Sequence, residues 1–194
     1  VGNVNELYVK NATELIKYRG PDDTNYYIDR KSKIFVGHNR LSIMDPEYGK
    51  QPLLSEDKKI IIAYNGEMYN QFELRKELLE KGIKFNSSSS DTEVILRGYQ
   101  VWKEKLFEKI DGQFALVILD INKNEIIFGR DKFGEKPIFY YQDNNKIVIG
   151  SELKIFKEFK NIKCEINETA FKKYFIYSFI PAPTTIYKRS EEHT

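Results

Sequence analysis

The sequence has little of what marks several protein classes. It has one cysteine, Cys164, among 194 residues, so no internal disulfide can form and a reducing compartment suits the chain. The two histidines lie far apart and give no zinc-ligand spacing, so we expect no metal site. No apolar run approaches the roughly 20 residues that a membrane helix needs, and no signal peptide is visible. We therefore expect a cytoplasmic protein without a membrane partner.

Neither sign of charge is in strong excess. Lysine and arginine number 31 against 29 aspartates and glutamates, which gives a net charge of +2. Charges so mixed are typical of a solvated surface and indicate no nucleic-acid partner. Hydrophobic residues make up 41% and charged residues 31%, which is ordinary for a globular protein. The length suits one domain, with at most a fragment of a second.

Hydrophobic periodicity distinguishes helices from strands along the chain. The predicted helices cover residues 5–18, 71–82, a segment that begins near 91, 152–159 and 167–179. The predicted strands cover 25–30, 33–44, 58–65 and two hairpins within 111–131 and 134–152. Groups of strands thus precede and follow groups of helices. This order predicts an α+β fold with largely antiparallel sheets.

Two helix ends carry local signals. Gly82 should end the helix that begins at residue 71, because glycine is the usual residue just past a helix. Ser90 and Glu93 have the spacing of a capping box, in which each side chain bonds the backbone N–H of the other residue. The side chains expected to face inward in the helix over 71–82 are Leu74, Leu78 and Leu79.

Polar residues crowd the end of the strand predicted over 58–65, at Asn65, Gly66 and Glu67. Asn-Gly is a strong hairpin signal, but a charged helical pattern follows here instead of an alternating strand. The alternative is an oxyanion site, in which the Asn65 amide and the Gly66 backbone N–H point at one developing negative oxygen. Glycine would let the backbone approach a ligand without a Cβ clash. These residues alone leave both interpretations open.

Single charged residues nearby are equally ambiguous. Arg40 could be a surface ion-pair partner or could grip a carboxylate with its planar fork. Asp91 could start a helix or hold a substrate ammonium. An arginine that binds a carboxylate and acids that bind an amine would together form an amino-acid pocket. The spacing of these residues in the sequence does not show that they lie in one site. His38 is expected to be structural, and Cys164 to be a small buried strand residue.

Longer motifs occur in a fixed order across residues 19–154. They are RGPDD, HNRLSIMD, QPL, YNGEMYN, SSDTEVIL, DGQFALVILD, GRDKFGEKPIFYY and GSELK. Together they closely resemble the glutaminase domain of glutamine-dependent asparagine synthetases, which are class II glutamine amidotransferases. The resemblance extends to residue 188, and the segment 179–188 resembles the chain that leads toward the synthetase domain.

The resemblance implies the N-terminal-nucleophile hydrolase fold, a four-layer αββα sandwich with two mainly antiparallel sheets. In that family the mature chain begins with a cysteine. Its thiol attacks the side-chain amide of L-glutamine, while its own α-amine acts as base. Ammonia leaves, and water hydrolyses the thioester to glutamate. Ammonia then passes to a synthetase domain that uses ATP and Mg²⁺ to convert aspartate to asparagine, whereas the glutaminase domain needs no cofactor.

The resemblance also assigns roles at matching positions. Asn65 and Gly66 correspond to the oxyanion donors, and Arg40 to the clamp on the glutamine α-carboxylate. Glu67 and Asp91 correspond to the acids near the α-amino group. The residues expected to line the pocket beside Arg40 are Leu41, Ser42, Ile43 and Met44. Such a pocket favours free glutamine, a zwitterion, over glutamine within a peptide.

The sequence departs from this family pattern in three places. No cysteine stands at its start, and Cys164 lacks a free α-amine, so the chain as given should bind glutamine weakly and hydrolyse none. Tyr18 stands where the family often has histidine. The Ser-Gly-Gly-x-Asp-Ser signature of the ATP-binding domain is missing. We therefore expect a protein cut at both ends.

The expected organisation has three parts. Residues 1–160 should form the amidotransferase domain, and 161–188 a helical segment that leads toward an absent synthetase domain. Residues 189–194 match one reading frame of a sequencing-library adapter, so we expect a non-native tail. The expected partners are L-glutamine, the chain's own C-terminal synthetase domain and a second copy in a homodimer. The alternatives are an amidotransferase for another carboxylate or sugar acceptor, and a non-catalytic module that binds an amino acid or a partner.

Overall fold

All strand pairs in the described part of the chain are antiparallel, as the sequence predicts. The computed structural model describes residues 1–42 and 49–193. Three sheets are present there, with the strand orders β1-β2, β3-β4-β5-β6 and β8-β7-β9. The strands are β1 (Asp23–Asp29), β2 (Ile34–Arg40), β3 (Leu53–Leu54), β4 (Ile60–Met68), β5 (Gly112–Asp120), β6 (Glu125–Arg130), β7 (Phe139–Asp143), β8 (Lys146–Gly150) and β9 (Ser190–Glu192).

Most helices agree with the predicted segments, with one change of type, but the two short helices between residues 103 and 109 were not predicted. The α-helices are α1 (Glu6–Leu15), α2 (Gln71–Glu80), α3 (Asp91–Trp102), α4 (Leu106–Lys109) and α5 (Glu168–Tyr177). The 3₁₀ helices are η1 (Lys17–Arg19), η2 (Lys103–Lys105) and η3 (Leu153–Glu158). The helix predicted over 152–159 thus takes the tighter 3₁₀ form, which is common in short segments. The predicted part boundaries, and the non-native origin of 189–194, stay predictions.

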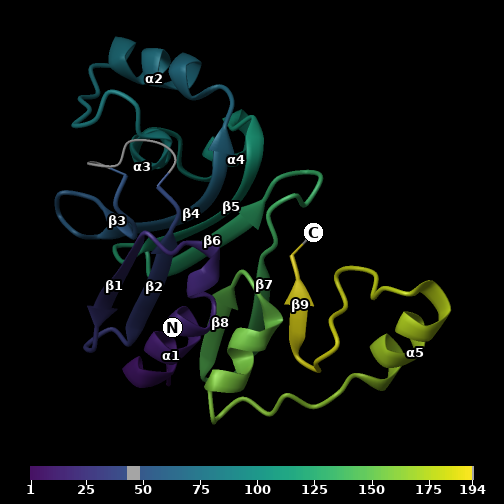
Figure 1. The fold of residues 1–194 in the computed structure, drawn as a ribbon. Coiled ribbons are helices and arrows are strands. Elements are labelled where there is room, and N and C mark those ends of the chain that lie inside the picture. Colours follow the sequence, from purple (N-terminus) through teal and green to yellow (C-terminus); the bar gives the residue numbers. More distant parts are fainter. Residues whose placement is uncertain (43–48, 194) are drawn as a thin grey trace.

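Two hydrophobic cores hold the layers together. One fills the space between α2, α3 and the β3–β6 sheet, where Leu78, Ile95 and Leu116 are fully buried. The other packs α1 and η3 against β7 and β8 around Tyr141 and Phe156. Figure 1 shows α2 and α3 on one side of the β3–β6 sheet, and the remaining strand pairs with α1 on the other. The order helix, sheet, strands and helix agrees with the predicted αββα sandwich, although the described strands form three sheets rather than two.

Strand β4 corrects the prediction that the polar residues stand at a strand end. The strand continues to Met68, and Gly66 and Glu67 pair with Phe114 and Gln113 of β5. The hairpin interpretation of Asn-Gly is therefore wrong. The turn propensity of this dipeptide is overridden because β5 supplies a complete antiparallel partner for the whole of β4.

Leu79 does not face inward. It is 53% exposed, whereas Leu74 and Leu78 are buried. Leu74 and Leu78 are four residues apart and lie on one helix face, but Leu79 lies about 100° further round the helix. Cys164 is another correction, because it is only partly buried and lies outside every strand.

The capping box at the start of α3 is only half formed. The Ser90 hydroxyl accepts a hydrogen bond from the Glu93 N–H at 3.2 Å, as predicted. The Glu93 carboxylate, however, accepts from the backbone N–H groups of Asn86 and Ser87, at 2.9 and 2.8 Å. The Ser90 N–H donates to the Ser87 hydroxyl instead. Glu93 therefore anchors the loop before the helix rather than the N-cap residue.

Helix α2 ends as its glycine predicts. The N–H of Gly82 donates to the Leu79 carbonyl at 2.9 Å, and the N–H of Ile83 donates to the Leu78 carbonyl at 3.0 Å. These two bonds form a Schellman motif, which requires a left-handed residue after the helix. Gly82 supplies it with a φ of +81°.

We expect Gly82→Ala to lower the free energy of unfolding by about 1 kcal/mol, because a Cβ is unfavourable in left-handed backbone. Steric crowding does not contribute to this cost, since no atom lies within 4 Å of the added Cβ. Gly82→Asn should cost less, because asparagine tolerates this conformation better. Urea denaturation of the three proteins measures the difference. Equal midpoints for the alanine variant and the parent would contradict this account of the helix end.

Candidate active site

Strand β4 presents alternate side chains to two different environments. Its even-numbered residues Ile60, Ile62, Tyr64 and Met68 belong to the core under the helices. Its odd-numbered residues Ala63, Asn65 and Glu67 line a cavity on the opposite face of the sheet. From β5, Ala115, Val117 and Leu119 line the same cavity. Asn65 and Glu67 therefore point into one space because they are two residues apart on one strand.

The backbone of β4 changes its partners along the edge that faces β3. Ile60 bonds Ser55 through both its N–H and its carbonyl. Four residues on, the Tyr64 N–H donates to the side-chain oxygen of Gln51 at 2.6 Å, because the chain has turned away there. Gly66 is the next residue with the same orientation, and it lies beyond these contacts.

The pairing with β5 leaves the Gly66 N–H on that same edge. In antiparallel pairs, every second residue pair exchanges no backbone hydrogen bonds. Phe114, opposite Gly66, uses its own backbone for Asp131: its N–H donates to the carboxylate at 3.2 Å, and its carbonyl accepts from the Asp131 N–H at 2.9 Å. The N–H of Gly66 thus points away from β5, and Gly66 lines the cavity.

Packing against β5 explains why this residue is glycine. A Cβ at Gly66 would lie 2.1 Å from the Gln113 carbonyl oxygen and 2.7 Å from the Cα of Phe114. Real contacts of this kind are longer, so any side chain would push the two strands apart. The sequence reasoning attributed the glycine to the approach of a ligand, whereas the closest contact in the structure is the neighbouring strand.

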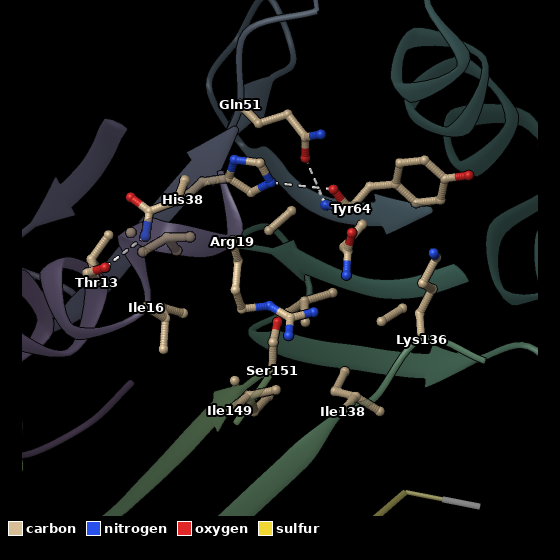
Figure 2. A pocket seen from close by; sticks show the side chains of 18 of the residues that line it. Thr13, Ile16, Arg19, His38, Gln51, Tyr64, Lys136, Ile138, Ile149 and Ser151 are labelled. Carbon is tan, nitrogen blue, oxygen red and sulfur yellow. Dashed lines mark hydrogen bonds between the residues drawn. The ribbon is translucent and has the colours of Figure 1, made fainter. Parts of the chain in front are cut away.

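Two side chains hold the backbone of Tyr64 in place (Figure 2). Gln51 accepts from its N–H, and His38 Nε2 lies 3.2 Å from its carbonyl oxygen, where the ring N–H donates. His38 belongs to β2, so this bond joins β2 to β4 at the cavity. His38 is therefore structural, as predicted. Burial lowers its pKa, and the nearby Arg40 lowers it further, against opposing effects of the Tyr64 hydrogen bond and Asp23.

Arg40 is the last residue of β2 and is buried at the cavity wall. The motif that begins at Arg19 supports it: the Asp22 N–H donates to the Arg40 carbonyl at 3.1 Å, and the Asp22 carboxylate accepts from the Ser42 N–H at 2.8 Å. Leu41 lines the cavity, and Ser42 is positioned by Asp22. The predicted pocket residues Ile43 and Met44 lie outside the described residues.

The two predicted acids both influence the Tyr64 hydroxyl. Glu67 comes from β4 and Asp91 from the first turn of α3, and both line the cavity. Burial, followed by the charges of Asp91 and Glu67, raises the pKa of the Tyr64 hydroxyl. Burial likewise raises the pKa of the Asp91 carboxyl, although hydrogen bonds from Thr92 and the Met68 backbone oppose this. A cation placed beside Asp91 would favour its charged form and so oppose the effect of burial.

Two basic side chains that the sequence reasoning did not select also reach the cavity. Figure 2 shows Arg19 and Lys136 extending into it from different elements. Arg19 donates to Glu152 at 3.2 Å, and Glu152 also accepts from the Tyr18 hydroxyl. The sequence feature that could have identified them is their position in the ordered motifs. Arg19 lies in RGPDD, and Lys136 lies in GRDKFGEKPIFYY.

Asp131 fixes the loop that carries Lys136. Its carboxylate accepts backbone N–H groups from Phe114, Phe133, Glu135 and Lys136, at 3.0 to 3.2 Å. Burial raises the pKa of this carboxyl, but the four donors outweigh burial and the pKa lies below its usual value. A carboxylate held in this way is a rigid anchor between β5 and the loop.

The cavity has a volume of about 590 Å³, enough for an amino acid. Its wall combines a buried arginine, two carboxylates and a pair of possible N–H donors at Asn65 and Gly66. All of the predicted site residues that the structure describes line it, except Ser42. This arrangement can bind a molecule with separated positive and negative groups and can stabilise an oxyanion.

Comparison with known proteins identifies the family. The profile described as "Glutamine amidotransferase domain" matches residues 2–193. The chain belongs to this glutamine amidotransferase family. Its relatives include asparagine synthetase (glutamine-hydrolyzing) 1 of Bacillus subtilis (strain 168), which is 40% identical over 181 residues, 93% of this chain and 28% of that protein. A putative asparagine synthetase (glutamine-hydrolyzing) 2 of Methanocaldococcus jannaschii is 38% identical over 204 residues, 94% of this chain and 38% of that protein.

Solved structures of similar proteins identify the fold. The glutamine phosphoribosylpyrophosphate amidotransferase of B. subtilis, solved with ADP and GMP, has a TM-score of 0.54 and 26% identity, over 64% of this chain and 29% of that chain. A structure described as the allosteric regulatory enzyme of purine biosynthesis has a TM-score of 0.58 and 21% identity, over 78% of this chain and 40% of that chain. The amidotransferase domain thus has the α+β N-terminal-nucleophile hydrolase fold. In its described part, no helix is long and apolar enough to cross a membrane.

We expect this amidotransferase domain to lose stability as the pH falls below about 6.5, the ordinary histidine value, because folded His38 resists protonation that the unfolded chain accepts. His38→Gln keeps an N–H for the Tyr64 carbonyl but does not titrate. Urea unfolding at pH 7.5 and 5.5 should therefore show a smaller pH-dependent loss for the variant. An identical loss in both proteins would sink this prediction.

Proposed function

We propose that this chain is the glutamine-hydrolysing part of an asparagine synthetase, with L-glutamine as substrate and glutamate and ammonia as products. The family and the names of the curated relatives support the proposal. The chain spans about a third of the length of those relatives, so the activity of the whole protein is part of the proposal. The observation that carries it is the single cavity shared by Arg40, Asn65, Gly66, Glu67 and Asp91.

The charges of the cavity suit a free amino acid. Arg40 binds the α-carboxylate, for which its planar fork is well shaped. Glu67, on β4, and Asp91, on α3, both bind the α-ammonium. Glutamine inside a peptide lacks both charges and would therefore lose the electrostatic pairing with Arg40, Glu67 and Asp91. The cavity therefore selects free L-glutamine.

The reaction begins when a cysteine thiol attacks the amide carbon of the bound glutamine. The new S–C bond forms as the carbonyl electrons move to oxygen, and the Asn65 amide and the Gly66 N–H stabilise that oxyanion. The thiol proton passes through the α-amine to the leaving nitrogen, so ammonia departs and a thioester remains. Water then hydrolyses the thioester to glutamate and regenerates the thiol.

In the proposed enzyme, the nucleophile is a cysteine placed before Val1. Val1 lies along β8, because its amine donates to the Ile147 carbonyl at 2.8 Å and its carbonyl accepts from the Ile147 N–H at 3.1 Å. Gly2 pairs with Lys146 in the antiparallel sense. In this register, earlier residues would run along β8 toward Ser151, which lines the cavity.

The base in the proposed reaction is the α-amine of that cysteine, which accepts the thiol proton in its neutral form. Burial lowers the pKa of the nearby Val1 amino group to about 6. The ammonia is then used by a further domain, which would hold ATP and Mg²⁺ and convert aspartate to asparagine.

The test is a longer chain that starts with the cysteine in place before Val1. We expect it to release ammonia and glutamate from L-glutamine, and to act poorly on N-acetyl-L-glutamine, which lacks the ammonium. A serine in place of the cysteine is the matched control and should abolish the release. A folded chain with the cysteine that produces no ammonia would refute the proposed function.

In that cysteine-initiated chain, we expect Asn65→Ala to lower turnover by about 10²–10³, because one oxyanion donor is lost. Glutamine affinity should change far less, since the bond is strongest in the transition state. Asn144→Ala, at an exposed turn between β7 and β8, is the matched control and should leave turnover unchanged. Steady-state kinetics separates the two effects, and unchanged turnover for Asn65→Ala would rule out its role.

A further inference from the structure

Arg75 of helix α2 is buried and binds the backbone of the loop that joins α2 to α3 (Figure 1). Its guanidinium donates to the Ser87 carbonyl at 2.6 Å and to the Ser90 carbonyl at 2.9 Å. The guanidinium carbon also lies 4.3 Å from the centre of the Phe85 ring. The planar fork of this arginine thus spans two carbonyl groups of one loop, a geometry that a lysine does not offer.

The first of these two residues, Ser87, is fixed by further bonds. Its N–H donates to the Glu93 carboxylate at 2.8 Å, and its hydroxyl accepts from the Ser90 N–H at 2.9 Å. Ser87 and Ser90 are both buried. Hydrogen bonds between buried groups are expensive to leave unmade, so the loop holds one arrangement up to Ser90.

Ser90 precedes Asp91, whose side chain lines the cavity. The peptide bond between them is planar, so the Ser90 carbonyl and the Asp91 N–H and Cα turn together. A bond that fixes the Ser90 carbonyl therefore fixes the direction in which the Asp91 residue leaves the loop. The Asp91 carboxylate also accepts from the adjacent Thr92 N–H at 2.7 Å, so a turn of this peptide would move the carboxylate relative to the cavity.

The start of α3 does not by itself need this arginine. The Ser90 hydroxyl already caps the helix at the Glu93 N–H, and the Ser90 carbonyl accepts from the Val94 N–H at 3.4 Å as the first bond of the helix. Burying a guanidinium costs desolvation, which its hydrogen bonds must offset. Its use at this carbonyl indicates that the orientation of the peptide matters beyond the helix.

We propose that Arg75 is a positioning residue, which holds the loop so that the Asp91 carboxylate meets the α-ammonium of the substrate. The proposal rests on the proposed function, in which Asp91 binds that ammonium. Among the described residues, the cavity wall includes Asp91 but not Arg75. Arg75 therefore acts through the backbone of the loop and does not touch the substrate.

The test compares two substrates of the cysteine-initiated chain, L-glutamine and glutaramate, which is glutamine without the α-amino group. For Arg75→Met we expect the KM for L-glutamine to rise about tenfold while kcat stays within about twofold, because binding of the ammonium is lost equally in the ground and transition states. Glutaramate has no ammonium, so its kcat/KM should stay within about twofold of the parent value. Equal losses with both substrates would indicate a merely structural role and would overturn the proposal.

Arg30→Met is the matched control. Arg30 is exposed, pairs with Glu6 at 2.6 Å and lies outside the cavity wall, so its loss should leave both substrates unaffected. A second comparison uses Asp91→Asn as the background. There, Arg75→Met should raise the KM for L-glutamine by at most about twofold, because the two residues act through one contact. The same tenfold rise in both backgrounds would overturn the proposal.

Arg75→Lys decides the case in which the methionine variant does not fold. Lysine keeps the charge but lacks the fork that spans both carbonyls, so we expect a KM for L-glutamine between those of the parent and the methionine variant. A lysine variant with the parent's KM would overturn the proposal. Calorimetry on the serine-initiated chain measures the same contrast without turnover, as the dissociation constants of the two ligands.

Failure of this inference and failure of the proposed function give different results. A folded parent chain that releases no ammonia refutes the proposed function. A parent chain that releases ammonia, with an Arg75→Met variant that keeps the same preference for L-glutamine over glutaramate, refutes the role of Arg75 and leaves the proposed function intact.

Discussion

The candidate site depends on the way β4 uses the two edges of its backbone. One edge pairs with β5 along the whole strand. The other edge bonds Ser55 and then the Gln51 side chain, and it leaves Gly66 beyond these contacts. A strand paired on both edges has no N–H to offer a ligand. The Gly66 N–H that we propose as an oxyanion donor is available because the neighbouring chain turns away before Gly66.

The same arrangement places opposite charges at a controlled separation. Arg40 ends β2, whereas Glu67 belongs to β4 and Asp91 starts α3. The bond from His38 to the Tyr64 carbonyl joins β2, which carries Arg40, to β4, which carries Glu67. Because sheets are stiff across their hydrogen bonds, a shift in how the layers pack would move Arg40 as a unit with β2. The recognition of a zwitterion that we propose would thus depend on the layer packing as much as on the side chains.

Much of this could be predicted from short segments. The start of α3, the end of α2 at Gly82 and the antiparallel pairing all follow from local patterns. The ordered motifs contain most of the residues that form the site. The errors have different causes. Leu79 lies about 100° round the helix from Leu78, so the helical period itself turns it outward. The Glu93 side chain bonds the loop at Ser87, a neighbouring segment that the capping-box pattern does not describe.

Local sequence alone accounts for the alternation that sends Asn65 and Glu67 to one face of a strand, since side chains alternate in any extended chain. It does not account for the strand passing through Asn-Gly, which required β5 as a partner, nor for the need for glycine at Gly66, which comes from the Gln113 carbonyl. It also could not bring Arg19 and Lys136 to the same cavity. These features arise from contacts between residues far apart in sequence, and only folding brings such residues within van der Waals and hydrogen-bond distance.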